Sequence, residues 1–419
     1  MIKDLYINLN TLLTKFILVG CLLCFSANAQ DLDTLKVRAA QNNLDLKAQY
    51  KAFEAQLENV TQAKSWQDPN LSFGYFISPI ETRVGPQIAR FSLTQMLPWF
   101  GTYKAKGDMA AFRAEAEFEK FQDQKLKLYL KVAEKYYDLS ALRFIAELET
   151  EQLQILEDLK TIVESNYENN KANLVDILRV ELQIDKQKNT IQVLKEQDQA
   201  LVTQLNQLMN RPLQTPVLIS NPEQILEQKE FKEMDSISEN HPRLEMIRNL
   251  QESNKAESVL AKKQALPQFG VGLDYAIIQD RNVMNADAGQ DAIMPMLSVS
   301  LPIFGKKNKS RKKQTSLQGE SLQFQLENEE SRLESEILVA QYQYDELINS
   351  VELHEKQMQK LNDILKLSEV ALANGEMQIE EVLRLYEEHL LHHKMKIRTL
   401  ADLQKTNETL NYLTSNSEL

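Results

Sequence analysis

Two pentapeptides decide the fold, LPWFG at residues 97–101 and LPIFG at residues 301–305. Each one joins a stretch in which apolar and polar residues alternate to a long run with almost no glycine or proline. Neither residue type occurs at 108–211, at 320–374 or at 376–419. Because turns depend on glycine and proline, runs of this length predict very long helices.

The chain is organised as two copies of one pattern. In each copy a helical stretch, at about 31–65 or 241–264, precedes a proline, a pair of strands and the pentapeptide. A helical run of roughly 60 residues and a last helix of about 35 follow. The pentapeptides are 204 residues apart, and the turn residues Asn170 and Gly375 between these helices are 205 apart. This agreement predicts a tandem duplication.

The strands of both copies alternate between large apolar residues and small or polar residues. We expect hairpins at 71–97 and 268–302, with strands of about nine to eleven residues, the length that a tilted strand needs to cross a membrane. A soluble sandwich has similar strands, but four strands are too few to build one with its own core. In lipid every backbone group needs a partner, so four strands require further chains to close a barrel. Two chains supply eight strands and three supply 12.

The long helices have the pattern of helices that pack together in water. In the first, apolar residues recur at spacings of 3, 4 or 7 from Leu128 to Tyr167, as along a coiled-coil seam. The other positions are rich in Glu, Lys and Gln, which excludes helices buried in lipid. The expected fold class is therefore mainly α with a small transmembrane β part.

The N-terminus has the composition of an export signal. The apolar stretch at 16–25 is followed by small residues, so residues 1–29 are interpreted as a cleaved signal peptide. A lipoprotein signal acylated at Cys21 is the alternative. Both cysteines, Cys21 and Cys24, lie in this segment. Thiol catalysis and cysteine-ligated metals are therefore excluded for a chain cut at this site.

Composition and motifs exclude several other functional classes. A net charge of −12 disfavours binding to nucleic acid. The sequence has no phosphate loop, dinucleotide fingerprint, HExxH motif or nucleophile elbow, so we expect neither an enzyme nor a cofactor. His389, His392 and His393 have a helical spacing that is compatible with a metal ion. An exposed helix face is the more frequent explanation of such spacing, and no metal site is assigned.

Together these features resemble the TolC-type outer-membrane efflux factors over about residues 31–413. The resemblance rests on the duplicated hairpins, on the pentapeptide at each junction of strand and helix, and on the turn motifs around Asn170 and Gly375. The compact length, DPNLSFGYFISP at 68–79 and RVGPQ at 83–87 are similar to the heavy-metal branch of that family, for cobalt, zinc and cadmium or copper and silver.

The resemblance implies a homotrimer with a shared 12-stranded barrel in the cell outer membrane and a tube of helices that extends into the periplasm. It implies a passive exit duct of a tripartite efflux system for small substrates, metal cations among them. The implied partners are a periplasmic adaptor, an inner-membrane pump of the RND type and outer-membrane lipid, without nucleic acid. One alternative is the duct of an ABC-driven type I protein secretion system. An alternative of another class is a periplasmic coiled-coil scaffold without a pore.

The resemblance also divides the chain into segments. After the signal peptide they are a first repeat at 30–212, an equatorial linker at 213–240, a second repeat at 241–413 and a tail at 414–419. The periplasmic tips of the tube are expected near 170–176 and 375–381.

Residues at the tips match the functional positions of the family. The acid six residues after the tip glycine is matched by Asp176 and Glu381, and three copies of each form acidic rings that attract cations. The basic residue that some relatives carry two positions after the glycine is missing. Arg179 and Arg384, about one turn beyond the acids, are expected to substitute for it. Contacts with the adaptor are expected at the tip turns, at Asn170, Lys171, Gly375 and Glu376.

The pentapeptides are interpreted as the hinge from barrel to tube. Proline lacks the N–H that a central strand needs, so Pro98 and Pro302 are expected where a strand stops pairing. Gly101 and Gly305 are expected to give the backbone freedom to turn.

Overall fold

The computed structural model describes residues 31–219, 222, 226, 240–280, 289–374 and 376–414. The predicted signal peptide with Cys21, most of the predicted linker, Gly375 and most of the predicted tail lie outside the described residues. Helices predominate and four strands are present, which confirms the mainly α fold class with a small β part.

The chain forms two compact units, which are described separately. Of the described residues, the helical unit contains those in Met1–Leu44, Lys125–Ser236 and Glu336–Leu419, and the sheet unit contains those in Asp45–Gln124 and Ile237–Ser335. Two helices run through both units, α4 (Thr102–Glu168) and α8 (Gly305–Asn374). None of the helices in the described residues is long and apolar enough to cross a membrane.

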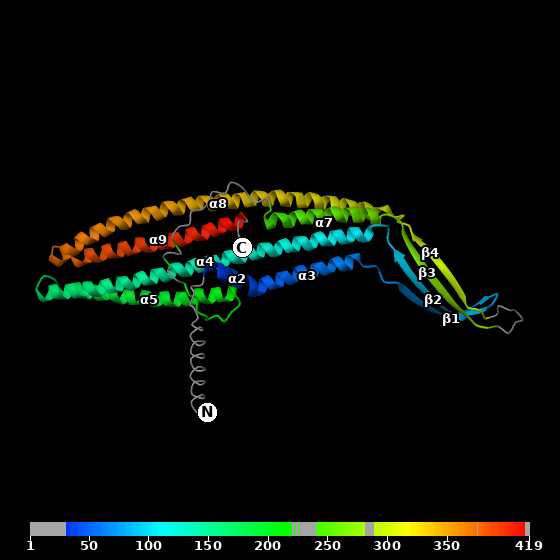
Figure 1. Ribbon diagram of the computed structural model, residues 1–419, viewed down its shortest axis with the longest axis horizontal. Helices are drawn as coiled ribbons and strands as arrows, with labels where there is room; N and C mark the ends of the chain where they lie inside the picture. Colours follow the sequence, from blue (N-terminus) through cyan, green and yellow to red (C-terminus); the bar gives the residue numbers. More distant parts are fainter. Residues whose placement is uncertain are drawn as a thin grey trace, which may run out of the picture. The chain divides into compact units, whose positions relative to one another are not determined.

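Four antiparallel strands build the sheet unit around one sheet. They are β1 (Asn70–Thr82), β2 (Gly85–Leu97), β3 (Gln268–Ile278) and β4 (Ala292–Ser300), and they lie side by side in chain order (Figure 1). The two hairpins join through β2 and β3, where Leu93 is opposite Leu273 and Phe91 is opposite Tyr275. The strand pairs of both copies are therefore parts of one sheet.

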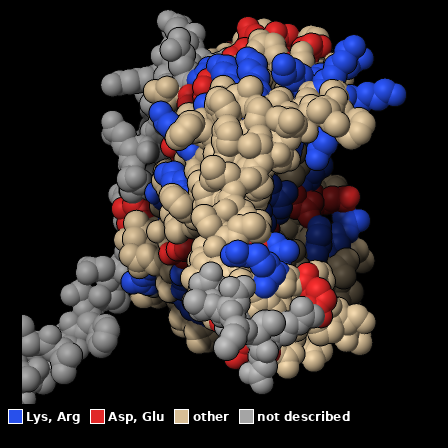
Figure 2. Space-filling model, turned by 90° about the vertical axis from the view of Figure 1, so that its right-hand side faces the viewer, with Lys and Arg blue, Asp and Glu red and all other residues tan. Residues whose placement is uncertain are grey.

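One face of this sheet is apolar and exposed. The register places apolar residues from all four strands in adjacent rows on it: Leu71, Phe73, Tyr75, Phe91, Leu93, Phe269, Val271, Leu273, Tyr275, Ile293, Leu297 and Val299. Leu297 is 87% exposed and Tyr75 is 68% exposed. Figure 2 shows an uncharged surface through the centre of the side on which the strands lie. Exposed apolar surface of this extent indicates contact with lipid or with another protein.

The opposite face of the sheet is polar. Asp274, which is buried, pairs with Arg90 and accepts a hydrogen bond from the hydroxyl of Ser92 on the neighbouring strand. Ser72 is opposite Ser92 in β1 and continues the polar row. The alternation seen in the sequence thus separates an apolar face from a polar one.

The junction of strand and helix in the first copy uses both special residues of LPWFG. β2 ends at Leu97, directly before Pro98, and Gly101 has a φ of +76°, a left-handed conformation that favours glycine. A Cβ atom at Gly101 would lie 2.9 Å from Nζ of Lys263. That ammonium donates a hydrogen bond to the carbonyl of Phe100 at 3.0 Å. The chain therefore turns sharply into α4 at this glycine.

The junction of the second copy is built differently. β4 ends at Ser300, and the N–H of Ile303 donates to the carbonyl of Leu301 at 2.9 Å, which closes a tight turn around Pro302. Gly305 is already the first residue of α8 and does not have a positive φ. The turn is completed before the glycine, so only Gly101 uses the conformational freedom expected of both.

Two shorter helices lead into the hairpins, α3 (Leu44–Lys64) and α7 (Pro242–Gln264). Aromatic rings join α3 to the start of α4, with the centroids of Phe53 and Phe118 5.1 Å apart. α7 is tied to both long helices, because Ser253 donates to the carbonyl of Met109 and Asn254 donates to that of Thr315, both at 3.0 Å.

The prediction of one helix at 31–65 is wrong in one respect, because the chain breaks there at Asn43. α2 (Leu32–Asn42) ends before Asn43, whose ψ of 128° is not helical. The side-chain amide of Asn43 donates to the carbonyl of Leu208 at 2.9 Å. That bond satisfies an acceptor at the end of another helix and fixes the break.

The helical unit packs four long helical segments against each other. They are the later parts of α4 and α8, α5 (Leu174–Leu208) and α9 (Ile379–Leu413). One core cluster joins all four and contains Leu156, Leu159, Val163, Val180, Ile184, Leu372, Ile379, Val382 and Leu383. The predicted seam of α4 is buried at Leu128, Val132 and Leu139, but its last member, Tyr167, is 46% exposed. Tyr167 lies in the final turn of α4, beyond the core residue Val163.

Candidate functional site

The first tip turn ends α4 with a left-handed asparagine. Asn170 has a φ of 56°, and the N–H of Lys171 donates to the carbonyl of Asn166 at 2.8 Å. The N–H of Asn170 also donates to the carbonyl of Tyr167, at 3.0 Å. The two bonds satisfy carbonyls that the end of the helix leaves without partners. Asparagine replaces glycine here because its short polar side chain tolerates the left-handed region.

The next helix, α5, begins with a reciprocal cap. Oδ1 of Asn173 accepts from the N–H of Asp176 at 3.1 Å, and Oδ2 of Asp176 accepts from the N–H of Asn173 at 3.0 Å. This capping box occupies one carboxylate oxygen of Asp176 at the start of the helix. The expected aperture residue therefore also has a local structural role.

The second tip turn repeats the backbone pattern of the first. The N–H of Glu376 donates to the carbonyl of Ala371 at 2.8 Å, as Lys171 does to Asn166. Glu381 lies three residues after the N-cap Gln378, as Asp176 lies three after Asn173, but Gln378 makes no side-chain cap. The Glu381 side chain is exposed. Asp176 and Glu381 are thus equivalent in position and differ in local bonding.

Two ion pairs connect the helices that begin at the two turns. Arg179 of α5 pairs with Glu380 of α9, and Nζ of Lys186 lies 3.0 Å from the Glu387 carboxylate. The spacing is seven residues on both helices, so α5 and α9 run in the same direction in one register. Arg384 is exposed, and no ion pair of this residue is found in the part of the chain that the structure describes.

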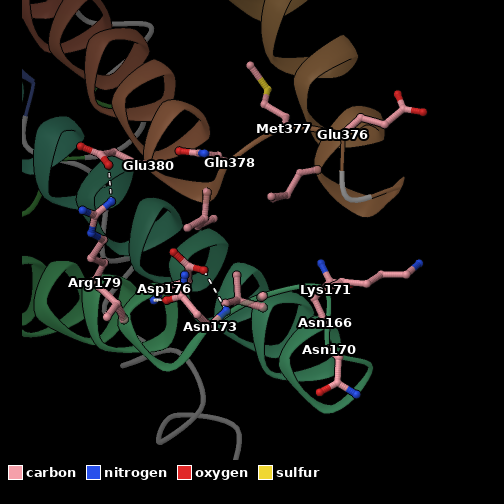
Figure 3. A pocket seen from close by; sticks show the side chains of 15 residues that line it. Asn166, Asn170, Lys171, Asn173, Asp176, Arg179, Glu376, Met377, Gln378 and Glu380 are labelled. Atoms are coloured by element: carbon pink, nitrogen blue, oxygen red, sulfur yellow. Dashed lines mark hydrogen bonds and ion pairs between the residues drawn. The ribbon is translucent and has the colours of Figure 1, made fainter.

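Both turns line one cavity of about 740 Å³. Its apolar wall includes Val163, Leu372 and Ile379, and its polar side chains come from both turns (Figure 3). Five of the predicted tip residues line it: Asn170, Lys171, Asp176, Arg179 and Glu376. Glu381 and Arg384 are not among the lining residues. The structure thus brings most of the predicted tip residues together.

Sequence reasoning missed three side chains at this site. Glu380 is the partner of Arg179, and the hydroxyl of Tyr386 on α9 donates to the carboxylate of Glu369 on α8. Burial, with the bond to Glu369 as a lesser cause, raises the pKa of the Tyr386 phenol, so this hydroxyl remains a donor. The heptad spacing of basic residues on α5 and acidic residues on α9 is the signal by which the α5–α9 pairs are recognisable.

A buried carboxylate lies further along the same helices. Oε1 of Glu149 on α4 is 2.7 Å from Nζ of Lys394 on α9, and Oε2 accepts from the side chain of Gln187 on α5 at 2.5 Å. The Glu149 side chain is only 3% exposed. This triad fixes the positions of three helices relative to each other, because a buried charge needs its partners.

The three histidines of α9 do not converge on one point. Nδ1 of His392 faces Nδ1 of His354 on α8 at 3.2 Å, whereas His393 packs edge-on against Phe144 of α4, with centroids 5.9 Å apart. Burial lowers the pKa of His393 to about 4, and nearby His389 and Lys396 add to the effect. Among the described residues, no group of three or more His, Cys, Asp or Glu side chains is placed to hold a metal ion.

Comparison with known proteins connects this architecture to a family. The sequence model of the outer membrane efflux proteins matches residues 35–211, which cover the first repeat with its hairpin and tip turn. The resemblance to the TolC-type efflux factors is thereby confirmed. No curated protein matches the sequence.

Solved structures show that the fold extends over nearly the whole chain. The outer membrane protein VceC from Vibrio cholerae matches with a TM-score of 0.73 and 15% identity, over 91% of this chain and 95% of that one. The open state of the outer membrane channel MtrE from Neisseria gonorrhoeae gives 0.72 and 14%, over 91% and 88%. CusC, a protein that forms a transmembrane channel, gives 0.72 and 13%, over 92% of both chains. At these identities the likeness establishes the fold.

Proposed function

We propose that the protein is the outer-membrane exit duct of a tripartite efflux system. In this proposal it passively conducts small substrates from a periplasmic adaptor and an inner-membrane pump of the RND type to the exterior. The observation that carries the proposal is the four-stranded sheet, with one exposed apolar face and one polar face. Among the described residues nothing pairs with the outer edges of β1 and β4, so these edges can pair with further copies of the chain.

The geometry of closed sheets supports a homotrimer. Four strands cannot close a barrel, and barrels of about eight strands are filled by their own side chains. Three chains supply 12 strands, which leaves a lumen. Lipid then covers the face with Leu297 and Tyr75, and Arg90 and Asp274 face the water-filled interior.

The tip cavity is the proposed contact with the adaptor. Its polar side chains come from both turns, and its apolar wall offers Val163 and Leu372 to an inserted side chain. We assign adaptor contact to Asn170, Lys171, Gly375 and Glu376. Such a site needs both turns at once, so adaptor binding would also depend on the position of α9 relative to α5.

The acids near the tips support cations as one class of substrate. Asp176 and Glu381 would each occur three times around the axis, and rings of carboxylates attract cations and repel anions. Metal cations, as in the heavy-metal branch, are therefore among the proposed substrates. The pump selects the substrate, and the duct supplies only the route.

The assembly is tested with the protein extracted in detergent. We expect a trimer by mass measurement and ion conductance in a planar bilayer. Leu297→Glu places a charge on the lipid face at a cost of up to about 2 kcal/mol and should reduce membrane assembly. Ser298→Glu is the matched control, because the adjacent residue lies on the polar face. A monomer without conductance, or equal behaviour of the two variants, would refute the duct and favour a periplasmic scaffold.

The transport class is tested in a deletion strain exposed to zinc, cobalt, copper, dyes and detergents. Increased sensitivity to any of these agents supports small-substrate efflux, and the pattern identifies the substrate class. Unchanged resistance, together with retention of an exported protein inside the cell, would assign the duct to type I secretion instead.

A further inference from the structure

The facing histidines of α8 and α9 form a cross-helix pair within the helical unit. His354 and His392 bring their Nδ1 atoms to 3.2 Å, with ring centroids 5.4 Å apart and the ring planes inclined at 44°. Both side chains are partly buried. α8 and α9 run alongside each other here (Figure 1), so the pair connects two helices whose covalent link passes through the second tip turn.

The distance between the two nitrogen atoms fits a shared metal ion. A tetrahedral Zn²⁺ ion binds imidazole nitrogen at about 2.0–2.1 Å, so two such ligands lie about 3.3 Å apart. Nδ1 is the coordinating atom in this arrangement, which leaves Nε2 of each ring to carry the proton. The metal-free pair is therefore close to the separation that two ligands of one ion require.

A buried amide lies beside the pair. Oε1 of Gln357, one turn after His354 on α8, is buried, and the Gln357 side chain lies within hydrogen-bond reach of the His354 ring. An amide oxygen is an acceptable additional ligand beside two imidazoles.

We propose that His354 and His392 bind one divalent transition-metal ion between α8 and α9, with Gln357 or water completing its coordination. Imidazole ligands suit Zn²⁺, Ni²⁺ and Cu²⁺. The ion would cross-link the two helices of the second hairpin at a fixed register, in addition to the covalent link through the tip turn. The site lies within one chain, so it depends neither on trimer formation nor on the proposed duct.

The test uses the full chain in detergent, without a polyhistidine tag and freed of metal. Zn²⁺ is titrated by calorimetry, and Co²⁺ is added as a spectroscopic probe whose visible absorption reports the coordination geometry. We expect one ion per chain, a tetrahedral Co²⁺ spectrum, and loss of that spectrum when Zn²⁺ is added. His354→Ala and His392→Ala should each weaken binding at least tenfold.

The matched control is His393→Ala, because His393 is turned toward Phe144 and should not bind the ion. Circular dichroism confirms that each variant retains its helices. Zn²⁺ should raise the thermal midpoint of the wild type and of His393→Ala, but not that of His354→Ala. Absence of binding to the wild type, or binding that His354→Ala leaves unchanged, would show that the short N···N contact is only a hydrogen bond and overturn the proposal.

Discussion

Arg179 of α5 and Glu380 of α9 form an ion pair just beyond the two tip turns, and Lys186 and Glu387 repeat it seven residues along both helices. All four side chains are largely exposed to water, where such a pair contributes only about 0.2–1 kcal/mol. The consequence of the pairs is therefore mainly geometric. They hold α9 at one position along α5 and thereby fix the spacing of the two turns that line the tip cavity.

Breaking the first pair should alter conductance more than stability. For Arg179→Ala we expect the thermal midpoint to change by only a few degrees, since the loss is at most about 1 kcal/mol. Single-channel conductance or open probability should increase, because α9 is then less firmly held. Planar-bilayer recording of the purified protein measures this, and high salt should reproduce part of the effect by screening.

The exchange of both charges, Arg179→Glu with Glu380→Arg, should restore wild-type conductance. Lys188→Ala is the matched control, because the ion pair of Lys188 is with Glu157 of α4. An equal increase in Lys188→Ala, or no recovery in the double exchange, would contradict this role of the α5–α9 pairs.

The buried triad should matter much more for stability. Glu149→Ala leaves the ammonium of Lys394 without its partner, and breaking a buried pair costs about 3–5 kcal/mol. Lys394 is 24% exposed, so we expect the lower end of that range. The double variant Glu149→Leu with Lys394→Leu should recover most of the loss, because it removes both charges. Thermal unfolding followed by circular dichroism measures each variant, and a loss in the single variant below about 1 kcal/mol would disprove the prediction.

Much of this fold is recognisable from the sequence because it depends on local patterns. Breaker-free runs predict α4 and α8, and period-two alternation predicts the apolar face of the sheet. The break at Asn43 is harder to predict from the sequence, since it depends on the carbonyl of Leu208 in another helix. Gly101 and Gly305 occupy equivalent positions in their pentapeptides, and only the backbone geometry shows that the second turn is complete before its glycine.

The candidate site can be predicted from the sequence to a similar extent. The turn at Asn170 follows from repeat spacing, and the acids after the turns follow from the family resemblance. The partners of these residues depend on tertiary register: the heptad spacing is compatible with pairing of α5 and α9, but only the folded chain shows that Glu380 faces Arg179. The pairing of His354 with His392 also depends on tertiary structure, because α8 and α9 meet only in the folded chain.

The stability of the helical unit should decrease at acidic pH. Burial lowers the pKa of His393 to about 4, whereas a histidine in an unfolded chain titrates near 6.5. Between these values the unfolded chain takes up a proton that the folded chain does not. The free energy of unfolding is therefore highest above about pH 6.5 and falls as the pH drops toward 4. The thermal midpoint at pH 7.5 and at pH 4.5 measures the change.

His393→Phe isolates this contribution, because it keeps an aromatic ring against Phe144 and removes the titrating group. We expect the thermal midpoint of the variant to decrease less between pH 7.5 and pH 4.5 than the thermal midpoint of the wild type. An identical loss in both proteins would assign the acid sensitivity to other groups.

The left-handed turn residue Asn170 should tolerate glycine and reject branched side chains. Asn170→Gly relieves a φ of 56° and should be neutral or slightly stabilising. Asn170→Val should cost about 1–3 kcal/mol, because a β-branched residue is strained in this region. Hydrogen exchange of the amide of Lys171, which donates to Asn166, reports the turn directly. Equal protection in the two variants would contradict this account of the first turn.

Ion selectivity is best tested at Glu381, because its carboxylate has the smaller structural role of the two tip acids. Asp176 closes a capping box, so its replacement by alanine removes its hydrogen bond from the N–H of Asn173 as well as a charge. Glu381→Gln removes only the charge, since the N-cap Gln378 makes no side-chain bond. We expect it to lower the permeability of K⁺ relative to Cl⁻, measured as the reversal potential across a salt gradient.

Asp176→Asn is the companion variant, because an asparagine side chain can still accept the hydrogen bond from the N–H of Asn173. The two neutral variants together should lower cation preference more than either one alone, since each removes one of the two acidic rings. The effect should diminish as salt is raised, because the Debye length decreases from about 10 Å at 0.1 M to about 3 Å at 1 M. If both single variants and the pair keep the reversal potential of the wild type, the acids at these positions are solvated helix surface and selectivity resides elsewhere.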